Sequence, residues 1–218
     1  MTSEPQPDIA ALRREYADRG LRESDLGPDP IAAFVRWHRE AFEAGLHEPN
    51  AMVVATVDGD VPSSRMVLLK TVDTRGFVFY TNTLSRKGRE LAANPACALL
   101  FPWHPLERQV RVEGAAELVG DAEADAYFRS RPRGSQLGAW ASPQSEVVAG
   151  RDFLADRYAH EDDRFDGLDE VPRPPHWSGY LVRPRVVEFW QGRPGRMHDR
   201  LRLERLDDTG WSLERLAP

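Results

Sequence analysis

Residues 52–81 read MVVATVDGDVPSSRMVLLKTVDTRGFVFYT, and this stretch decides the fold. It holds three runs rich in β-branched and aromatic residues, which predict strands: Met52–Val57, Ser64–Val72 and Phe77–Thr81. Asp58-Gly59 lies between the first two runs and is a strong signal for a two-residue hairpin turn. Thr74-Arg75-Gly76 predicts the turn before the third strand. The stretch therefore predicts consecutive strands joined by tight turns.

The same pattern continues through the rest of the chain. Further strands are predicted at Ala96–Trp103, Arg108–Val119, Gly179–Arg183, Arg185–Trp190, Arg200–Leu206 and Trp211–Leu216. Strands at such short spacing favour a barrel or sandwich over βαβ units. We expect one domain over residues 1–218, mainly β with packed helices, in which residues 1–7 are disordered and about 8–46 form N-terminal helices.

Helices are predicted before and between these strands. Their positions are Asp8–Asp18, a segment that begins at Asp29-Pro30, Ser85–Ala93, Asp121–Arg129 and Glu146–Arg164. The expected N-caps are Asp8, Asp29, Ser85 and Asp121, because their side-chain oxygens can accept hydrogen bonds from the first turn. The apolar face predicted for the second helix consists of Ile31, Phe34, Val35, Trp37 and Phe42. Residues 131–135 and 166–175 are predicted loops.

Composition narrows the range of functions. The formal net charge of the 218 residues is −6, which gives the whole chain no electrostatic footprint for nucleic acid. The N-terminus lacks an apolar signal-peptide core, and no apolar run approaches the roughly 20 residues that span a bilayer. We therefore expect a soluble cytoplasmic protein. Cys97 lies in an apolar run and is interpreted as a small buried hydrophobe, and no Cys/His spacing predicts a metal site.

The distribution of lysine points to an anion site. Only Lys70 and Lys87 are lysines among the 29 basic residues, and both lie between residues 65 and 87. Lys87 and Arg86 fall in the first turn of the helix that Ser85 caps, where free N–H groups and the helix dipole favour an anion. Together with Arg65 they predict a phosphate site. The alternative is an ordinary basic surface turn.

Two other clusters carry possible chemistry. Tyr127, Arg131 and Ser135 could form a second anion site at a helix end, although basic residues opposing a helix dipole are common there. Arg196, His198 and Arg200 alternate after Trp190, whose ring could lie on a planar cofactor. A polar edge strand is the alternative for this third cluster.

The chain resembles the pyridoxamine 5′-phosphate oxidase family over nearly its whole length. The resemblance rests on nine motifs that occur in order: Leu12–Tyr16, Arg65–Lys70, Phe79–Asn82 with Ser85–Lys87, Glu107–Val110, Ser130–Arg133, Ser135–Trp140 with Gln144-Ser145, Val187–Gly192, Arg196–Arg200 and Arg215–Pro218. It implies an FMN-binding split β-barrel that works as a homodimer, with FMN at the subunit interface. Met197 stands where the family often has Leu, a volume-conserving change.

The resemblance also implies a role for individual residues. The FMN phosphate would contact Arg65, Arg86 and Lys87. The rest of FMN would contact Met66, Val67, Leu68, Lys70, Tyr80, Thr81, Gln109, Gln144, Ser145, Trp190 and Arg200. The substrate phosphate would contact Lys70, Tyr127, Arg131 and Ser135, while Arg196 and His198 would flank the substrate ring as catalytic residues. Arg13 and Tyr16 would belong to a lid over the substrate.

The implied reaction is the oxidation of pyridoxamine or pyridoxine 5′-phosphate to pyridoxal 5′-phosphate by O2, which yields H2O2 and, from the amine, ammonia. The flavin would carry the redox chemistry, and the protein would supply orientation and charge. Two alternatives stay open. One is a split-barrel oxidoreductase that uses flavin or deazaflavin on another substrate; the other is a non-catalytic protein that binds FMN or pyridoxal phosphate.

Overall fold

The computed structural model describes residues 15–207 and 210–218. In this part of the chain nine strands form one antiparallel sheet. The strands are β1 (Ala51–Asp58), β2 (Val61–Leu68), β3 (Thr71–Asp73), β4 (Gly76–Asn82), β5 (Ala96–Trp103), β6 (Arg108–Leu118), β7 (Trp177–Gln191), β8 (Asp199–Leu206) and β9 (Gly210–Leu216). Their order is β2-β1-β5-β6-β7-β4-β3, and β8 and β9 extend from β7. The prediction of a mainly β chain is confirmed.

Strand β7 organises the sheet because it has different neighbours along its length. One edge pairs with β6 throughout. The other edge pairs with β4 over residues 177–182 and with β8 over residues 186–191. Pro184 lies between these two segments, beside a β-bulge at Glu113/Gly114 on β6. Proline has no N–H to donate, so it is tolerated at such a bulge, and the two strands predicted here are one bent strand.

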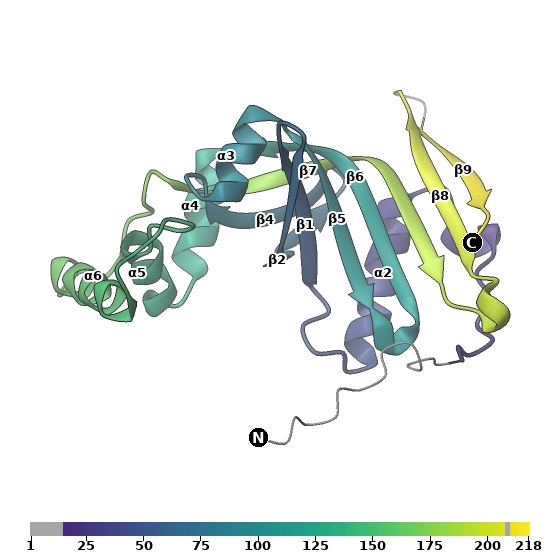
Figure 1. Ribbon diagram of the computed structural model, residues 1–218, viewed down its shortest axis with the longest axis horizontal. Helices are drawn as coiled ribbons and strands as arrows, with labels where there is room; N and C mark the ends of the chain where they lie inside the picture. Colours follow the sequence, from purple (N-terminus) through teal and green to yellow (C-terminus); the bar gives the residue numbers. More distant parts are fainter. Residues whose placement is uncertain (1–14, 208–209) are drawn as a thin grey trace, which may run out of the picture.

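Helix α2 (Pro30–Glu43) covers one face of the sheet (Figure 1). Asp29 caps it as predicted, accepting a hydrogen bond from the Ile31 N–H. The Phe34 side chain is fully buried and meets the rings of Phe77 and Phe101 at centroid distances of 4.9 and 4.7 Å. These contacts join the helix to β4 and β5. Phe42 and Val35 were predicted on the buried face, but they are 70% and 44% exposed.

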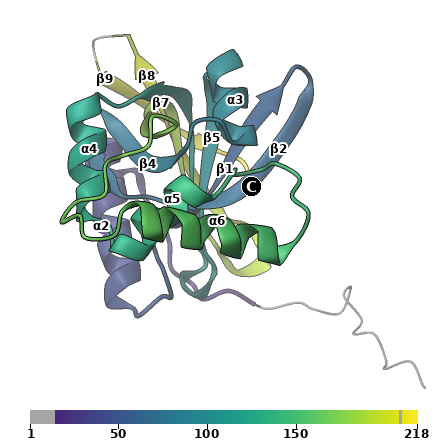
Figure 2. The ribbon, with the colours of Figure 1, turned by 90° about the vertical axis from the view of Figure 1, so that its left-hand side faces the viewer.

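Three further helices lie at the end of the sheet where β4 and β7 meet (Figure 2). They are α4 (Asp121–Ser130), α5 (Arg133–Ala141) and α6 (Arg151–Arg164). Short helices complete the described chain: α1 (Glu23–Leu26), α3 (Arg86–Ala93), η2 (His104–Leu106) and η3 (Pro194–Arg196). Ser85 caps α3 as predicted and accepts a hydrogen bond from the Gly88 N–H. None of the helices described here is long and apolar enough to cross a membrane.

Several predicted boundaries are wrong. The strand predicted over residues 64–72 is two strands: β2 pairs with β1, β3 pairs with β4, and Leu69 and Lys70 between them belong to neither. The hairpin turn is Gly59-Asp60, since Asp58 already pairs with Val61. The loop predicted at 131–135 becomes α5 from Arg133 onward, and the helix predicted from Glu146 begins at Arg151.

The first predicted helix, residues 8–18, lies mostly outside the described residues. Its described part, from Glu15, is not helical. The Ala17 N–H donates to Glu107 Oε2 at 2.8 Å, and the Leu21 N–H donates to Asp199 Oδ2 at 3.0 Å. Carboxylates of the sheet thus satisfy backbone donors that a helix would have satisfied internally. These two hydrogen bonds hold the segment from Glu15 to Leu21 in a non-helical conformation against β8 and the start of β6.

Replacing Phe34 by alanine tests how α2 is held. The change removes a fully buried ring and should lower the free energy of unfolding by about 3–5 kcal/mol. Phe42→Ala on the exposed side of the same helix should change it by about 0.5 kcal/mol or less. Urea denaturation at one fixed protein concentration measures both. Equal losses for the two variants would contradict the described packing.

Candidate active site

A cavity of about 730 Å³ lies between the strand segments β2 and β4 and the helices α4 and α5. Eleven residues predicted to bind cofactor or substrate line it: Met66, Val67, Leu68, Lys70, Tyr80, Thr81, Lys87, Tyr127, Arg131, Ser135 and Gln144. β2 is an edge strand of the sheet order. One side of its backbone therefore has no strand neighbour within the described chain, which leaves N–H and C=O groups for a ligand.

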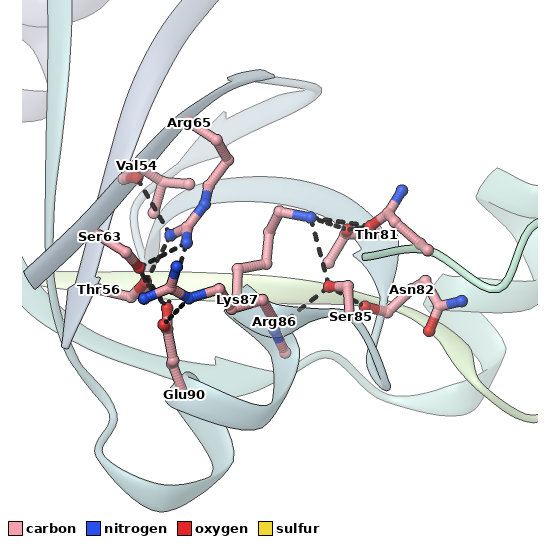
Figure 3. A network of polar contacts seen from close by, with 12 residues as sticks. Val54, Thr56, Ser63, Arg65, Thr81, Asn82, Ser85, Arg86, Lys87 and Glu90 are labelled. Atoms are coloured by element: carbon pink, nitrogen blue, oxygen red, sulfur yellow. Dashed lines mark hydrogen bonds and ion pairs between the residues drawn. The ribbon is translucent and has the colours of Figure 1, made fainter. Parts of the chain in front are cut away.

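Lys87 is the buried cation of this cavity (Figure 3). Its ammonium donates to Thr81 Oγ1 at 3.1 Å, Ser85 Oγ at 3.3 Å and Gln144 Oε1 at 2.8 Å. All three acceptors are neutral. Burial, together with the positive charge of Arg65, lowers the pKa of Lys87 to about 8. An anionic oxygen in place of one of these acceptors would stabilise the charged form.

Arg65 and Arg86 lie beside Lys87 and share one carboxylate, that of Glu90 (Figure 3). Arg65 Nη2 is 3.2 Å from Glu90 Oε2, and Arg86 Nε is 2.8 Å from Glu90 Oε1. The two terminal amino groups of Arg86 make no hydrogen bond to any residue the structure describes. The structure thus brings together the three basic residues predicted to bind one phosphate, on β2 and the first turn of α3.

Another basic residue of the cavity lining, Arg131, lies directly after α4. Its guanidinium stacks on Trp177, 4.7 Å from the ring centroid, and Tyr127 and Tyr80 stack parallel to that ring. Its Nη1 atom is buried without a hydrogen-bond partner among the described residues. Burial lowers the pKa of Arg131. A buried, unpartnered donor on a cation fits an anionic ligand, because leaving it unpaired costs about 1–3 kcal/mol.

The predicted residues near the C-terminus form a separate group. His198 lies 4.7 Å from Trp190 and 5.6 Å from Tyr16 between ring centroids. The Arg193 N–H donates to His198 Nδ1 at 3.1 Å, so the neutral ring carries its proton on Nε2. Arg196 is exposed at a positive φ of 61°.

Two more predicted residues belong to this second group. Arg200 Nε donates to the buried Glu188 at 2.8 Å, and Gln109 pairs with Trp190 across the sheet.

The last two predicted residues lie elsewhere in the chain. Ser145 follows Gln144 with a φ of 74° in the loop after α5. Arg13 lies outside the described residues.

The two groups lie at opposite ends of β7 (Figure 1). Trp177 lines the cavity at the start of this strand, and Trp190 lies near its end. Thirteen residues separate them, which is about 43 Å along the strand at about 3.3 Å per residue. Of the predicted residues in the second group, none lines the cavity. One chain therefore does not bring all the predicted site residues together.

Some residues of these networks were not predicted. Glu90, Glu188 and Trp177 are buried, and each contacts a predicted site residue. The spacing of Arg86 and Glu90, four residues apart on a predicted helix, was a signal for the first of them. Glu188 and Trp177 gave no such signal, since their contacts depend on the pairing of distant strands.

Comparison with known proteins identifies the family. Residues 38–163 match the model described as pyridoxamine 5′-phosphate oxidase, and residues 177–218 match the pyridoxine 5′-phosphate oxidase C-terminal dimerisation region. The chain belongs to the pyridoxamine 5′-phosphate oxidase family. The prediction of an FMN-dependent enzyme is confirmed at the level of this family. The dimerisation region agrees with the predicted homodimer.

Individual relatives agree with this assignment. The chain is 63% identical over 212 residues to a pyridoxine/pyridoxamine 5′-phosphate oxidase of a Nocardioides species, with 97% of this chain and 98% of the relative covered. It is 58% identical to that of Rubrobacter xylanophilus, with 97% of each chain covered. Among solved structures, PhzG from Burkholderia lata, in complex with tetrahydrophenazine-1-carboxylic acid, has a TM-score of 0.85 and 32% identity, covering 92% of this chain and 99% of PhzG. The split-barrel prediction is confirmed, with a sheet that does not close.

The pKa of Lys87 predicts how FMN binding depends on pH. Binding of the phosphate dianion should require the ammonium form, so the Kd for FMN should rise about tenfold per pH unit above about pH 8. Below that pH it should level off, until the phosphate takes up its second proton near about pH 6. Flavin-fluorescence titrations between pH 6.5 and 9.5 measure this. Riboflavin, which lacks the phosphate, is the control, and parallel curves for the two flavins would contradict the prediction.

Proposed function

We propose that this protein oxidises pyridoxamine 5′-phosphate and pyridoxine 5′-phosphate to pyridoxal 5′-phosphate, with O2 as the final oxidant and H2O2 as a product, and ammonia as a further product from the amine. One observation carries the proposal. A single cavity is lined both by the buried Lys87 and by the half-buried Arg131, whose Nη1 atom is buried without a hydrogen-bond partner among the described residues. Two basic sites in one cavity suit two phosphate esters held together, the cofactor and the substrate.

Lys87 with Arg65 and Arg86 would hold the FMN phosphate, and the open backbone edge of β2 at Met66–Leu68 would contact the rest of the cofactor. Bound there, FMN would supply the acceptor for a hydride from the substrate carbon. The residues of the chain hold the two reactants in a fixed relation, which removes much of the entropic cost of their encounter. Thr81 and Gln144, which now accept hydrogen bonds from Lys87, lie beside this site.

Arg131 would bind the substrate phosphate, helped by Lys70 and by the hydroxyl groups of Tyr127 and Ser135. These groups line the cavity with Arg131. The stacked rings beneath the guanidinium fix its plane, so little side-chain entropy is lost when it binds. The unpartnered Nη1 would then gain a charged acceptor.

Arg196 and His198 would come from the partner subunit, with FMN bound at the interface. The length of β7 supports this arrangement, since it separates these residues from the cavity of their own chain. Because His198 Nδ1 accepts the Arg193 N–H, the neutral ring presents an Nε2–H donor. We infer that His198 orients a substrate oxygen by donating to it. Proton removal is then left to Arg196 or to water.

The PhzG neighbour suggests a second candidate function. PhzG is described with a tetrahydrophenazine carboxylic acid, a polycyclic ligand without phosphate. A related activity on such a substrate would not need Lys70, Tyr127, Arg131 and Ser135 to converge, and their presence in one cavity favours the phosphorylated substrate. The same group argues against a deazaflavin enzyme of another substrate, and the Arg196–Arg200 segment argues against a non-catalytic binder.

Anaerobic reduction tests the proposed reaction. The FMN-loaded protein should lose its yellow colour when mixed with pyridoxamine 5′-phosphate or pyridoxine 5′-phosphate, and should recover it in air with formation of H2O2. A protein that stays yellow with both compounds, or that only a tetrahydrophenazine carboxylic acid bleaches, would contradict the proposal.

Arg131→Met should raise the KM for pyridoxine 5′-phosphate roughly 10- to 100-fold, because hydrogen bonds to charged groups contribute about 1.5–3 kcal/mol each. The Kd for FMN should stay within about twofold of the unmodified value. Arg129→Met, which removes an exposed arginine of the same helix, is the matched control and should leave both constants unchanged. Steady-state kinetics and flavin titration measure them. An unchanged KM in Arg131→Met would contradict the assignment.

A mixed dimer tests whether the site is shared between subunits. One subunit carries Arg131→Met and the other His198→Ala, and two affinity tags isolate the heterodimer. If each site combines the cavity of one subunit with the His198 group of the other, one site is intact and the heterodimer has about half the normal activity at low substrate. A site within one chain would leave both sites damaged, and the heterodimer would be as slow as the parent variants.

A further inference from the structure

Glu90 is a buried carboxylate at the centre of the basic cluster, and nothing in the proposed reaction uses it. Glu90 is 4% exposed and lies on the buried face of α3. Four donors reach it: the hydroxyl groups of Thr56 and Ser63, Arg65 Nη2 and Arg86 Nε. Ser63 Oγ, 2.6 Å from Glu90, also accepts a hydrogen bond from Arg65 Nη2 at 2.6 Å (Figure 3).

The hydrogen bonds to Glu90 keep it ionised. Burial alone would raise its pKa, but the donors from Ser63, Thr56, Arg86 and Arg65 outweigh burial and lower the pKa to about 2. The carboxylate therefore stays negative throughout the neutral range. Each of its two oxygens engages a different guanidinium, one from β2 and one from α3. Glu90 thus fixes the position of a strand residue relative to a helix residue.

The net charge of the cluster formed by Glu90, Arg65, Arg86 and Lys87 balances that of a phosphate ligand. Arg65, Arg86 and Lys87 carry three positive charges and Glu90 one negative charge, which leaves a net charge of +2. A phosphate monoester at neutral pH carries close to two negative charges. Arg86 meets Glu90 through Nε only, so its outward amino groups stay available to such a dianion. Glu90 therefore holds the guanidinium groups without using all their donors.

We propose that Glu90 is a positioning residue for the cofactor phosphate: it orders Arg65 and Arg86 before the phosphate binds. The proposal rests on the assignment of these arginines to FMN. Each arginine side chain loses rotamer entropy when it is fixed, and a carboxylate that has already fixed both side chains removes that cost from the binding step. A carboxylate near a phosphate also repels it, so the test must distinguish ordering from repulsion.

The experiment compares the Kd values of FMN and riboflavin for the unmodified protein and for Glu90→Gln, each prepared without flavin. The two ligands share the ring system and the ribityl chain and differ in the phosphate. A general loss of structure weakens both, whereas a role in positioning the phosphate ligands weakens FMN alone. Glu90→Gln should therefore lower the preference for FMN over riboflavin about tenfold, and Glu90→Asp should recover part of it.

A second variant and a control complete the experiment. Ser63→Ala removes a hydroxyl that bridges Glu90 and Arg65, and it should lower the same preference about two- to threefold even if Glu90→Gln does not fold. Glu146→Gln breaks an exposed ion pair with Arg89 on the same helix and should leave the preference unchanged.

Each contrary outcome has a distinct meaning. An unchanged preference in Glu90→Gln and Ser63→Ala would overturn the proposal and leave Glu90 a purely structural residue. A higher preference would also overturn it, since repulsion would then dominate over ordering. If the unmodified protein itself binds riboflavin as tightly as FMN, the phosphate site of the proposed function fails, and the role of Glu90 fails with it.

Discussion

The length of strand β7 constrains everything else in this molecule. Its 15 residues run continuously past β6, so the cavity at its start and the His198 group near its end lie apart in the folded chain. The bulge at Gly114 and the proline at 184 bend the strand without breaking it. Under the proposed function, a second copy of the chain would supply the His198 group to the cavity, and the enzyme would work as a dimer. The match of residues 177–218 to a dimerisation region fits this constraint, since they include β7 itself.

Buried carboxylates support the arginines in both halves of the proposed site. Glu90 holds Arg65 and Arg86, and Glu188 holds Arg200 and Arg111. In each case a buried carboxylate on a regular element forms ion pairs with two guanidinium groups. A guanidinium fixed in this way keeps its plane and some of its donors, whereas a free side chain would lose entropy on binding. Lys87 differs, because its acceptors are neutral and its charge is left without a carboxylate.

The strands and two of the helix caps could be predicted from the sequence because their signals are local. Asp121 was expected to cap α4, but Gly120 occupies the cap position and Asp121 is the first helical residue. Alternating and β-branched runs predicted the strands, and Asp29 and Ser85 marked two helix starts. Local signals failed where distant groups decide the conformation. Glu15–Asp18 is not helical, because Glu107 and Asp199 accept hydrogen bonds from nearby N–H groups, and Arg133–Ser135, predicted as part of a loop, begins helix α5. The motifs gave the candidate site residues, but they gave no sign that these residues form two groups about a strand length apart. Glu90, Trp177 and Glu188 were missed because their roles depend on pairing across the sheet.

The most direct test of this account is a crystal structure of the protein with FMN and pyridoxal 5′-phosphate bound. The account predicts a dimer in which each FMN phosphate contacts Arg65, Arg86 and Lys87 of one subunit, while the substrate ring meets Arg196 and His198 of the other. Glu90 should still bind both arginines in the complex. A structure in which one chain supplies all these contacts, or in which the FMN phosphate lies away from Lys87, would contradict it.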